Sequence, residues 1–292
     1  MQAVLEDRGR APQPGTRLGP YRLIKRLKQG GMPTVYLGDY LLIRAYVAIK
    51  IVDGSAVDLK LVSREIAIMQ ALEHEHLVPC LDAGQFGSYH YLVMPYLRGG
   101  TLEDKLKGRL LTLEEASVLL EQLSSALTYM HAFGLLHRDI KPANILFDCN
   151  HKLFLADFGT VSWLGEKPGY DGHMMGTPQY VAPEILAGYV DERSDIYSVG
   201  ILLYRMLTGY VPFDGPRDQI YLHHWQTQPL APSLRNPSLP RPVERVILRA
   251  LEKDPSRRYQ TIEGLLHAYQ KAIEAPTFFK QLSWHGKKYV RS

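Results

Sequence analysis

Short runs of apolar residues occupy much of the first hundred positions of the chain. They read YRLIKRL, TVYLGDY, AYVAIKIV and YHYLVMPYL, and they begin at Tyr21, Thr34, Ala45 and Tyr89. Runs of this length, rich in Val, Ile, Leu and Tyr and separated by glycine or polar turns, are typical of β-strands. The pattern therefore predicts a mostly β region that ends at about residue 95.

Helical periodicity interrupts these strands once and dominates after them. The segment DLKLVSREIAIMQALE carries apolar residues at helical spacing, and Glu65 flanks that stripe where it can reach inward. Beyond Gly100, TLEDKL and TLEEASVLLEQLSSALTYMHAFG each open on a threonine followed by acidic residues, which indicates a capped helix start. The segment SDIYSVGILLYRML begins a strongly apolar helix. The apolar stripe of the first helix is predicted to be Leu59, Val62, Ile66, Met69 and Leu72.

The stretch HRDIKPANILFDCNHKLFLADFG, residues 137–159, places polar residues around two short apolar runs. These runs are expected to pair as a hairpin, which would bring the two ends of the stretch together. Oxygen ligands hold Mg²⁺, a lysine offsets phosphate charge, and a carboxylate positions a hydroxyl nucleophile, so the set suits phosphoryl transfer. Its members are Asp139, Lys141, Asn144 and Asp157. The alternative is an ordinary hairpin whose polar residues, Asp148 included, serve only the turn. The order and spacing of HRD, KPxN and DFG argue against that alternative.

Composition and charge narrow the class of protein. A chain of 292 residues with 46% hydrophobic and 22% charged residues is ordinary for a globular enzyme with a full core. A net charge of +4 without a dense basic run gives no reason to expect a nucleic-acid partner. The two cysteines, Cys80 and Cys149, fit a reducing cytoplasm and exclude a disulfide framework. The apolar runs are too short for a membrane segment, so the expected location is cytoplasmic.

The two ends of the chain differ in composition from the rest. Residues 1–18 are rich in Arg, Pro and Gly, and they are predicted to form a flexible lead-in. Residues 276–292 interleave aromatic and basic residues. Phe278, Phe279 and Trp284 would be unusual in a disordered end, so this tail is expected to dock on the domain; the alternatives are that it precedes a membrane anchor or hangs free.

The motifs together resemble those of the bacterial eukaryotic-like Ser/Thr protein kinases. The resemblance includes VAIK at 47–50, the HRD to DFG stretch, and GTPQYVAPE at 176–184, and it runs from about Tyr21 to about Ala272. It implies an α+β, two-lobed fold over residues 19–275. The N-lobe, about 19–95, would be mostly β with one key helix. A hinge at about 95–98 would lead into a mostly α C-lobe at about 99–275.

The resemblance also implies an activity. The chain would transfer the γ-phosphate of ATP, with Mg²⁺ or alternatively Mn²⁺, to Ser or Thr of protein substrates in signalling, and also to itself. Asp139 would accept or orient the hydroxyl proton, and Lys141 would steady the γ-phosphate. Asn144 and Asp157 would hold the metal ion. Lys50, aligned by Glu65, would fix the α- and β-phosphates.

The nucleotide-binding segments depart from the family pattern at two places. In the phosphate-covering loop Lys28 and Pro33 replace the first and third glycines, while Gly30 keeps the second. In the hinge Pro95 replaces a residue that is usually acidic, but it keeps the carbonyl that would face adenine. The implied gatekeeper is Met94, and the Leu97 N–H would be the complementary donor. The implied ATP contacts are Leu27, Gly30, Gly31, Val35, Ala48, Lys50, Met94, Pro95, Leu97, Asn144, Leu146 and Asp157.

The later motifs imply structural and regulatory contacts. Thr177 and Pro178 resemble a substrate-binding loop, Glu184 would pair with Arg258, and Asp195 would anchor the backbone of the HRD loop. The middle of the activation segment, 163–176, contains no Ser or Thr. Activation is therefore predicted to need no phosphate there. Order would come from a carboxylate opposite Arg138, or from a contact with a partner or a second copy of the chain in a homodimer. The candidate carboxylates are Glu166 and Asp171.

Two other functions compete with the kinase interpretation. A pseudokinase that binds ATP and partners without transfer is suggested by the altered glycine loop, but Lys50, Glu65, Asp139, Asn144 and Asp157 are all present. A small-molecule phosphotransferase would share the Asp and Asn core. It would not be expected to carry GTPxYxAPE, which shapes a surface for peptides.

Overall fold

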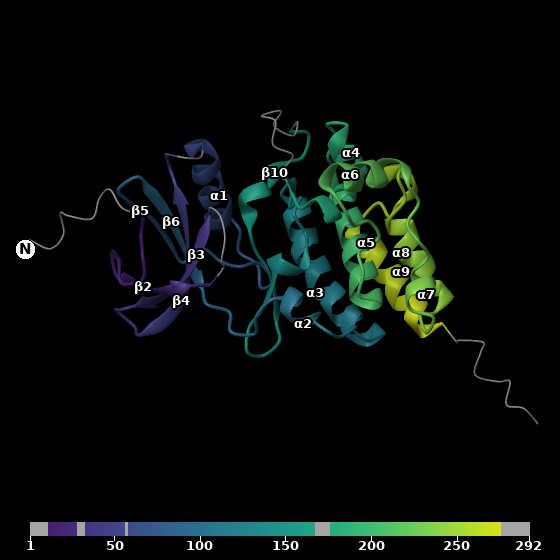
Figure 1. Ribbon diagram of the computed structural model, residues 1–292, viewed down its shortest axis with the longest axis horizontal. Helices are drawn as coiled ribbons and strands as arrows, with labels where there is room; N and C mark the ends of the chain where they lie inside the picture. Colours follow the sequence, from purple (N-terminus) through teal and green to yellow (C-terminus); the bar gives the residue numbers. More distant parts are fainter. Residues whose placement is uncertain (1–10, 28–32, 56–57, 167–175, 276–292) are drawn as a thin grey trace, which may run out of the picture.

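The computed structural model describes residues 11–27, 33–55, 58–166 and 176–275. Its N-terminal part is an antiparallel sheet with the strand order β1-β2-β3-β4-β6-β5 (Figure 1). The strands are β1 (Arg17–Leu18), β2 (Tyr21–Arg26), β3 (Thr34–Tyr40), β4 (Ala45–Asp53), β5 (Asp82–Phe86) and β6 (Tyr89–Pro95). The strands predicted from the apolar runs are thus confirmed, and β1 and β5 are additions.

Residues 11–18 do not form the flexible lead-in that their composition predicts. Strand β1 pairs with β2 along Arg17 and Leu18, and Leu18 is only 1% exposed. The carbonyl of Pro12 accepts a hydrogen bond of 2.8 Å from the buried hydroxyl of Tyr36. These tertiary contacts hold a proline- and glycine-containing segment that has no apolar period of its own. Residues 1–10 and the tail 276–292 lie outside the described residues.

The two faces of the sheet have different roles. Val47, Ile49 and Ile51 alternate along β4 and are buried in a small core of the N-terminal part. The residues between them, Ala48 and Lys50, therefore point to the opposite face. That face looks toward the helical part of the protein, because the Lys50 ammonium contacts a carboxylate there.

Helix α1 (Leu59–Ala71) packs between the sheet and the helical part. Asp58 caps its start by accepting a hydrogen bond from the Lys60 N–H. The buried face differs from the predicted stripe, because Leu59 is 47% exposed and Ile66 is only half-buried. Glu65 is on the buried side together with Val62, Ile68 and Met69. The helix is therefore rotated so that a charged residue, and not a full apolar stripe, faces inward.

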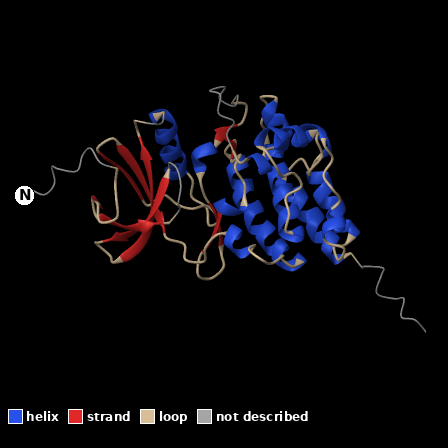
Figure 2. Ribbon diagram, viewed as in Figure 1, coloured by secondary structure: helices blue, strands red, loops and turns tan. Residues whose placement is uncertain are grey.

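The C-terminal part is mostly helical (Figure 2). Its longest helices, α3 and α5, begin at capping boxes opened by Thr112 and Asp191, and α5 is buried along nearly its whole length. A helix buried all round belongs to the centre of a core, and α8 and α9 pack around α5. The helices are α2 (Leu102–Lys105), α3 (Leu113–Ala132), α4 (Pro183–Leu186), α5 (Glu192–Thr208), α6 (Arg217–Gln226), α7 (Pro232–Arg235), α8 (Arg241–Ala250) and α9 (Ile262–Glu274). Among the described residues, no helix is long and apolar enough to cross a membrane.

A small hairpin and a second two-stranded sheet follow α3 in the chain. The predicted hairpin is confirmed as β8 (Ile145–Phe147) and β9 (Leu153–Leu155), which pair antiparallel. The β9 end bonds to the segment after α1, and the β8 end bonds to the segment after β6. Strand β7 (Leu135–Leu136) pairs with β10 (Ser162–Trp163). The expected α+β fold of two lobes is thus confirmed, and the β8–β9 hairpin joins the polar stretch 137–159 to the segments that follow α1 and β6.

Candidate active site

Buried Asp195 fixes the backbone of the polar stretch. Its carboxylate accepts hydrogen bonds from the N–H groups of His137 (2.9 Å) and Arg138 (2.8 Å), and it lies 3.0 Å from His131 Nε2. Burial alone would raise the pKa of Asp195, but these partners hold it below its ordinary value. Arg138 takes a left-handed conformation, with φ of +65°, that is strained for a residue other than glycine. The predicted anchoring role of Asp195 is confirmed.

Asp139 is held by donors on both of its oxygens. One oxygen accepts from Lys141 Nζ (2.5 Å) and Asn144 Nδ2 (2.9 Å). The other accepts from the backbone N–H (3.0 Å) and the hydroxyl (2.8 Å) of Thr177. Lys141 also donates to that hydroxyl at 2.7 Å. A serine or threonine hydroxyl therefore already sits between the carboxylate and the ammonium of this site.

Lys50 joins the two lobes. Its ammonium donates to Glu65 (2.7 Å) on α1 and to Asp157 (2.8 Å) after β9, so the predicted Lys50–Glu65 pair is confirmed. Burial would lower the pKa of Lys50, but the charges of Asp157 and Glu65 outweigh it and raise the pKa. For Asp157, burial would raise the pKa, and the Lys50 charge and hydrogen bond bring it below the ordinary value. At neutral pH Lys50 and Asp157 are therefore both charged.

The oxygens near Asp157 fit a hard divalent cation. The Asn144 amide nitrogen donates to Asp139, so its carbonyl oxygen remains for a ligand. Asp157 keeps 41% of its side chain exposed although it contacts Lys50, and its backbone is left-handed with φ of +70°. A carboxylate and a carboxamide oxygen are ligands that Mg²⁺ prefers, with phosphate oxygens and water completing the shell. The described residues offer no cluster of three or more His, Cys, Asp and Glu side chains for a metal ion.

Four of the predicted nucleotide contacts, Val35, Ala48, Lys50 and Met94, lie on one face of the sheet. Val35 stands opposite Lys50, and Ala48 stands opposite Met94, and residues directly opposite in antiparallel strands share a face. Val35, Ala48 and Met94 are only half-buried although they are apolar. Pro95 ends β6. Leu97, which follows this strand, and Leu146, in β8, are half-buried. Leu27 is 38% exposed beside β3. Lys28, Gly30 and Gly31 lie outside the described residues.

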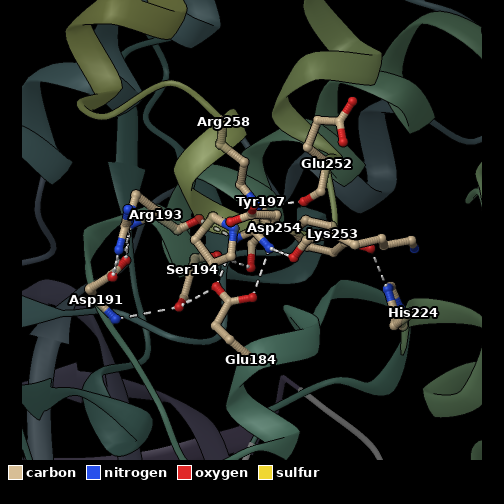
Figure 3. Close-up of polar contacts among 12 residues, drawn as sticks. Glu184, Asp191, Arg193, Ser194, Tyr197, His224, Glu252, Lys253, Asp254 and Arg258 are labelled. Carbon is tan, nitrogen blue, oxygen red and sulfur yellow. Dashed lines mark hydrogen bonds and ion pairs between the residues drawn. The ribbon is translucent and has the colours of Figure 1, made fainter. Parts of the chain in front are cut away.

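A buried polar network joins Glu184 of α4 to the start of α5 and to the segment before α9 (Figure 3). Arg258 is fully buried and donates from both terminal nitrogens to Glu184 at 2.7 Å, which confirms the predicted pair. Its remaining N–H groups bond to backbone carbonyls of Glu252, Arg193 and Lys253. The guanidinium also lies 4.7 Å from the centroid of the Tyr197 ring. Every donor of Arg258 is therefore used, as burial of a charge requires.

The described start of the activation segment is held by a contact with α1 that was not predicted. Glu166 pairs through both oxygens with Arg64 of α1, one of the contacts measuring 2.6 Å, and Arg64 directly precedes Glu65. Hydrogen bonds from Arg64 lower the pKa of Glu166 to about 2, and the charge of Arg138 adds a smaller effect. Glu166 therefore forms its ion pair with Arg64, which was not predicted, and its charge also interacts with that of Arg138, the residue it was expected to face. Asp171 lies outside the described residues.

Several contacts at the site were not foreseen from the sequence. Arg64 reads as an ordinary polar position on the outer face of a helix, and His131 reads as the end of another helix. Thr177 was assigned to a substrate loop, but its bonds to Asp139 and Lys141 were not predicted. The sequence carried no local signal for the role of Arg64, because adjacent residues of a helix point in different directions and the place of Glu65 does not reveal what Arg64 contacts.

The two-lobed fold and the side chains at its centre point to the protein kinase class. The chain belongs to the protein kinase family, whose model, described as Protein kinase domain, matches residues 21–270. Serine/threonine-protein kinase PrkC of Bacillus subtilis (strain 168) is 34% identical over 265 residues, covering 88% of this chain and 41% of that protein. Serine/threonine-protein kinase pkn2 of Myxococcus xanthus is 35% identical over 279 residues, covering 89% of this chain and 33% of that protein. The chain thus spans less than half the length of these relatives.

Proposed function

We propose that residues 19–275 form a kinase domain that transfers the γ-phosphate of MgATP to serine or threonine hydroxyls of proteins. Residues 95–98 would be the hinge between its lobes. The observation that carries the proposal is the hydroxyl of Thr177 between Asp139 and Lys141. A substrate hydroxyl placed there would meet a carboxylate that accepts its proton and an ammonium that attracts the incoming phosphate. Relatives that are named serine/threonine-protein kinases support the same assignment.

Each residue of the site would have a separate role in phosphoryl transfer. Asp139, fixed by four donors, orients the acceptor hydroxyl and takes up its proton as the new P–O bond forms. Lys141 offsets negative charge on the transferring group. Lys50, aligned by Glu65, holds the other phosphates of the nucleotide. Asn144 and Asp157 would hold Mg²⁺, which when bound neutralises phosphate charge.

A direct assay separates this function from its rivals. Purified protein is incubated with labelled ATP and Mg²⁺, and with either a basic generic protein or a series of small alcohols. We expect label on the protein and none on the alcohols. Label on the alcohols alone would indicate a small-molecule phosphotransferase, and nucleotide binding without any transfer would indicate a pseudokinase. No feature of the described residues favours the pseudokinase.

Pro33 is expected to limit nucleotide affinity. It precedes β3, is exposed, and has no N–H to offer a phosphate. A lost charge-assisted hydrogen bond is worth about 1.5–3 kcal/mol, which corresponds to roughly a ten- to hundredfold effect at most. Pro33→Gly should therefore lower the Kd for ATP, measured by calorimetry. Pro20→Gly, in a turn before β2, serves as the control. An unchanged Kd and rate for Pro33→Gly would show that the loop does not limit the enzyme.

Activation should need no phosphate in the middle of the activation segment. The described hydroxyls near it are engaged or buried: Thr160 donates to the His137 carbonyl, Ser162 is 3% exposed, and Thr177 is bonded to Asp139. We infer that the Glu166 carboxylate orders the segment through Arg64. Because Arg64 neighbours Glu65, the same contact holds α1 in the position that the Lys50–Glu65 pair needs.

Treatment with a Ser/Thr phosphatase should leave the rate on an added protein substrate unchanged. Arg64→Ala and Glu166→Gln should each lower that rate by about fivefold, the size expected for a partly exposed ion pair. The double variant should be no worse than either single one. Lys60→Ala, an exposed change on the same helix, should have no effect. A large loss after phosphatase, traced to phosphate leaving Thr160, Ser162 or Thr177, would contradict the inference.

A further inference from the structure

A polar cavity of about 800 Å³ opens next to the proposed catalytic loop. Lys141 and Thr177, which hold Asp139, form its wall on the active-site side. Arg205, near the end of α5, and Arg235, at the end of α7, lie on its other sides. The cavity is therefore continuous with the place where a substrate hydroxyl would react.

Arg205 places a guanidinium in this cavity, and only some of its N–H groups have acceptors within the protein. Its guanidinium donates to Glu103 (2.5 Å) and to the hydroxyl of Tyr180 (2.8 Å), and 24% of its side chain stays exposed. The Tyr180 hydroxyl accepts from Arg205, and among the described residues no acceptor is found for its own hydrogen. Burial raises the pKa of Tyr180 to about 12, so that hydrogen is present at neutral pH. Two donors thus face the cavity from α5 and the loop before α4.

Arg235 contributes a second cation without a carboxylate partner in the part of the chain that the structure describes. Its guanidinium lies 4.6 Å from the centroid of the Tyr210 ring and also contacts the Tyr204 phenol. Stacking on an aromatic ring fixes the guanidinium plane while leaving its N–H groups to a ligand. An exposed arginine held in this way is suited to bidentate recognition of an anionic group.

Three cations and two carboxylates line the cavity. Lys141 is committed to Asp139, which lies outside the lining, and Arg205 is paired with Glu103. Arg235 and Asp214 remain, and among the described residues they form no ion pair with each other, so the Arg235 guanidinium is still available to an anionic ligand. A lysine or arginine of a substrate would therefore meet Arg205 and Arg235 as well as any acidic residue. An anionic side chain would find two guanidinium groups and the Tyr180 hydroxyl.

We propose that this cavity, built by Arg205, Arg235 and Tyr180, binds an anionic side chain of the protein substrate close to the acceptor Ser or Thr. The inference rests on the proposed kinase function and adds a substrate preference to it. The cavity adjoins Lys141 and Thr177, and an extended chain advances about 3.5 Å per residue. The recognised residue therefore lies within about five positions of the acceptor.

Peptides with a single serine test this preference. In an alanine-rich background, one position at a time within five residues of the serine is changed to Asp, phosphoserine or Lys. We expect one position at which Asp raises kcat/KM over Ala by about tenfold, the size of one charge-assisted contact, and at which Lys lowers it. A larger gain with phosphoserine than with Asp would identify a phosphorylated residue as the better ligand, and the reverse would identify a carboxylate.

Variants of the cavity residues test whether the preference for an anionic residue depends on this cavity. Arg235→Glu should bring the Asp-to-Ala ratio of kcat/KM close to one, whereas Glu103→Gln, which frees Arg205, should raise that ratio. Arg245→Glu, the same change at an exposed position on α8 outside the cavity, should leave both the ratio and the rate unchanged. Thermal unfolding checks that each variant is folded.

Two results would overturn the inference. Equal rates for all peptides, or an unchanged ratio in folded Arg235→Glu, would remove the cavity as a specificity site and leave the kinase assignment intact. Failure to phosphorylate every peptide and also the generic protein would remove the proposed function, and this inference with it.

Discussion

Asp157→Asn should abolish phosphoryl transfer while leaving the protein folded. Asp157 is one of two carboxylates on the Lys50 ammonium, and it is partly exposed where a metal-bound phosphate would sit. Asparagine has nearly the same shape but no charge, so it neither balances Lys50 nor holds a divalent ion firmly. We expect a loss of roughly a thousandfold or more in kcat/KM. Lys50→Met should act in the same direction, because it removes the cation that both Glu65 and Asp157 contact.

The matched control for this change is Asp148→Asn on the same hairpin. Asp148 accepts hydrogen bonds from the N–H groups of Asn150 and Lys152 in the turn, a role that asparagine also fills. The transfer rate of the Asp148→Asn variant should therefore stay near that of the unmodified protein. Initial rates of label transfer, with circular dichroism as the test of folding, decide the matter. Near-normal turnover by folded Asp157→Asn would show that the assigned role is wrong.

Arg258→Met should cause the largest loss of stability. Removing the guanidinium leaves the Glu184 carboxylate buried without its main partner and frees three backbone carbonyls. Breaking a buried pair in this way costs about 3–5 kcal/mol. That is a large share of the total stability of a typical domain, about 5–15 kcal/mol. Urea unfolding should show the loss as a lower midpoint.

The neighbouring Arg257→Met provides the control. Arg257 has 72% of its side chain exposed and lies 3.9 Å from Asp254, so we expect almost no change in the free energy of unfolding. Glu184→Gln keeps hydrogen-bond acceptors for Arg258 but removes the charge, and its loss should be intermediate. If Arg258→Met unfolded at the same urea concentration as Arg257→Met, the buried network would not contribute to stability as proposed.

The sequence predicted those features that depend on local pattern or on motif. The strands, the hairpin of residues 137–159 and the inward Glu65 follow from periodicity, because a charged residue at the flank of an apolar stripe can reach a buried lysine. Glu184–Arg258 and the Asp195 anchor followed from the resemblance to a family. Their contacts cross 74 and 57 residues of sequence, and no periodic signal would have joined them.

What could not be predicted depends on tertiary contacts between residues with no local signal. Residues 11–18 are held by one short strand and by a hydrogen bond from Tyr36, which composition does not reveal. Arg64 and Glu166 are separated by 102 residues, and each resembles an ordinary surface residue when seen alone. Arg205 is the one charged residue of α5 after Asp195, and its role depends on the cavity that α7 and the loop before α4 complete.

The central claim is that Asp139 directs phosphate from ATP to a protein hydroxyl. The most direct test is to incubate the unmodified protein and Asp139→Asn with labelled ATP, Mg²⁺ and a generic protein, and then to identify the labelled amino acids after acid hydrolysis. The account predicts label on serine or threonine with the unmodified protein and almost none with the variant, although both bind ATP. Label on tyrosine alone, or equal label from both proteins, would contradict it.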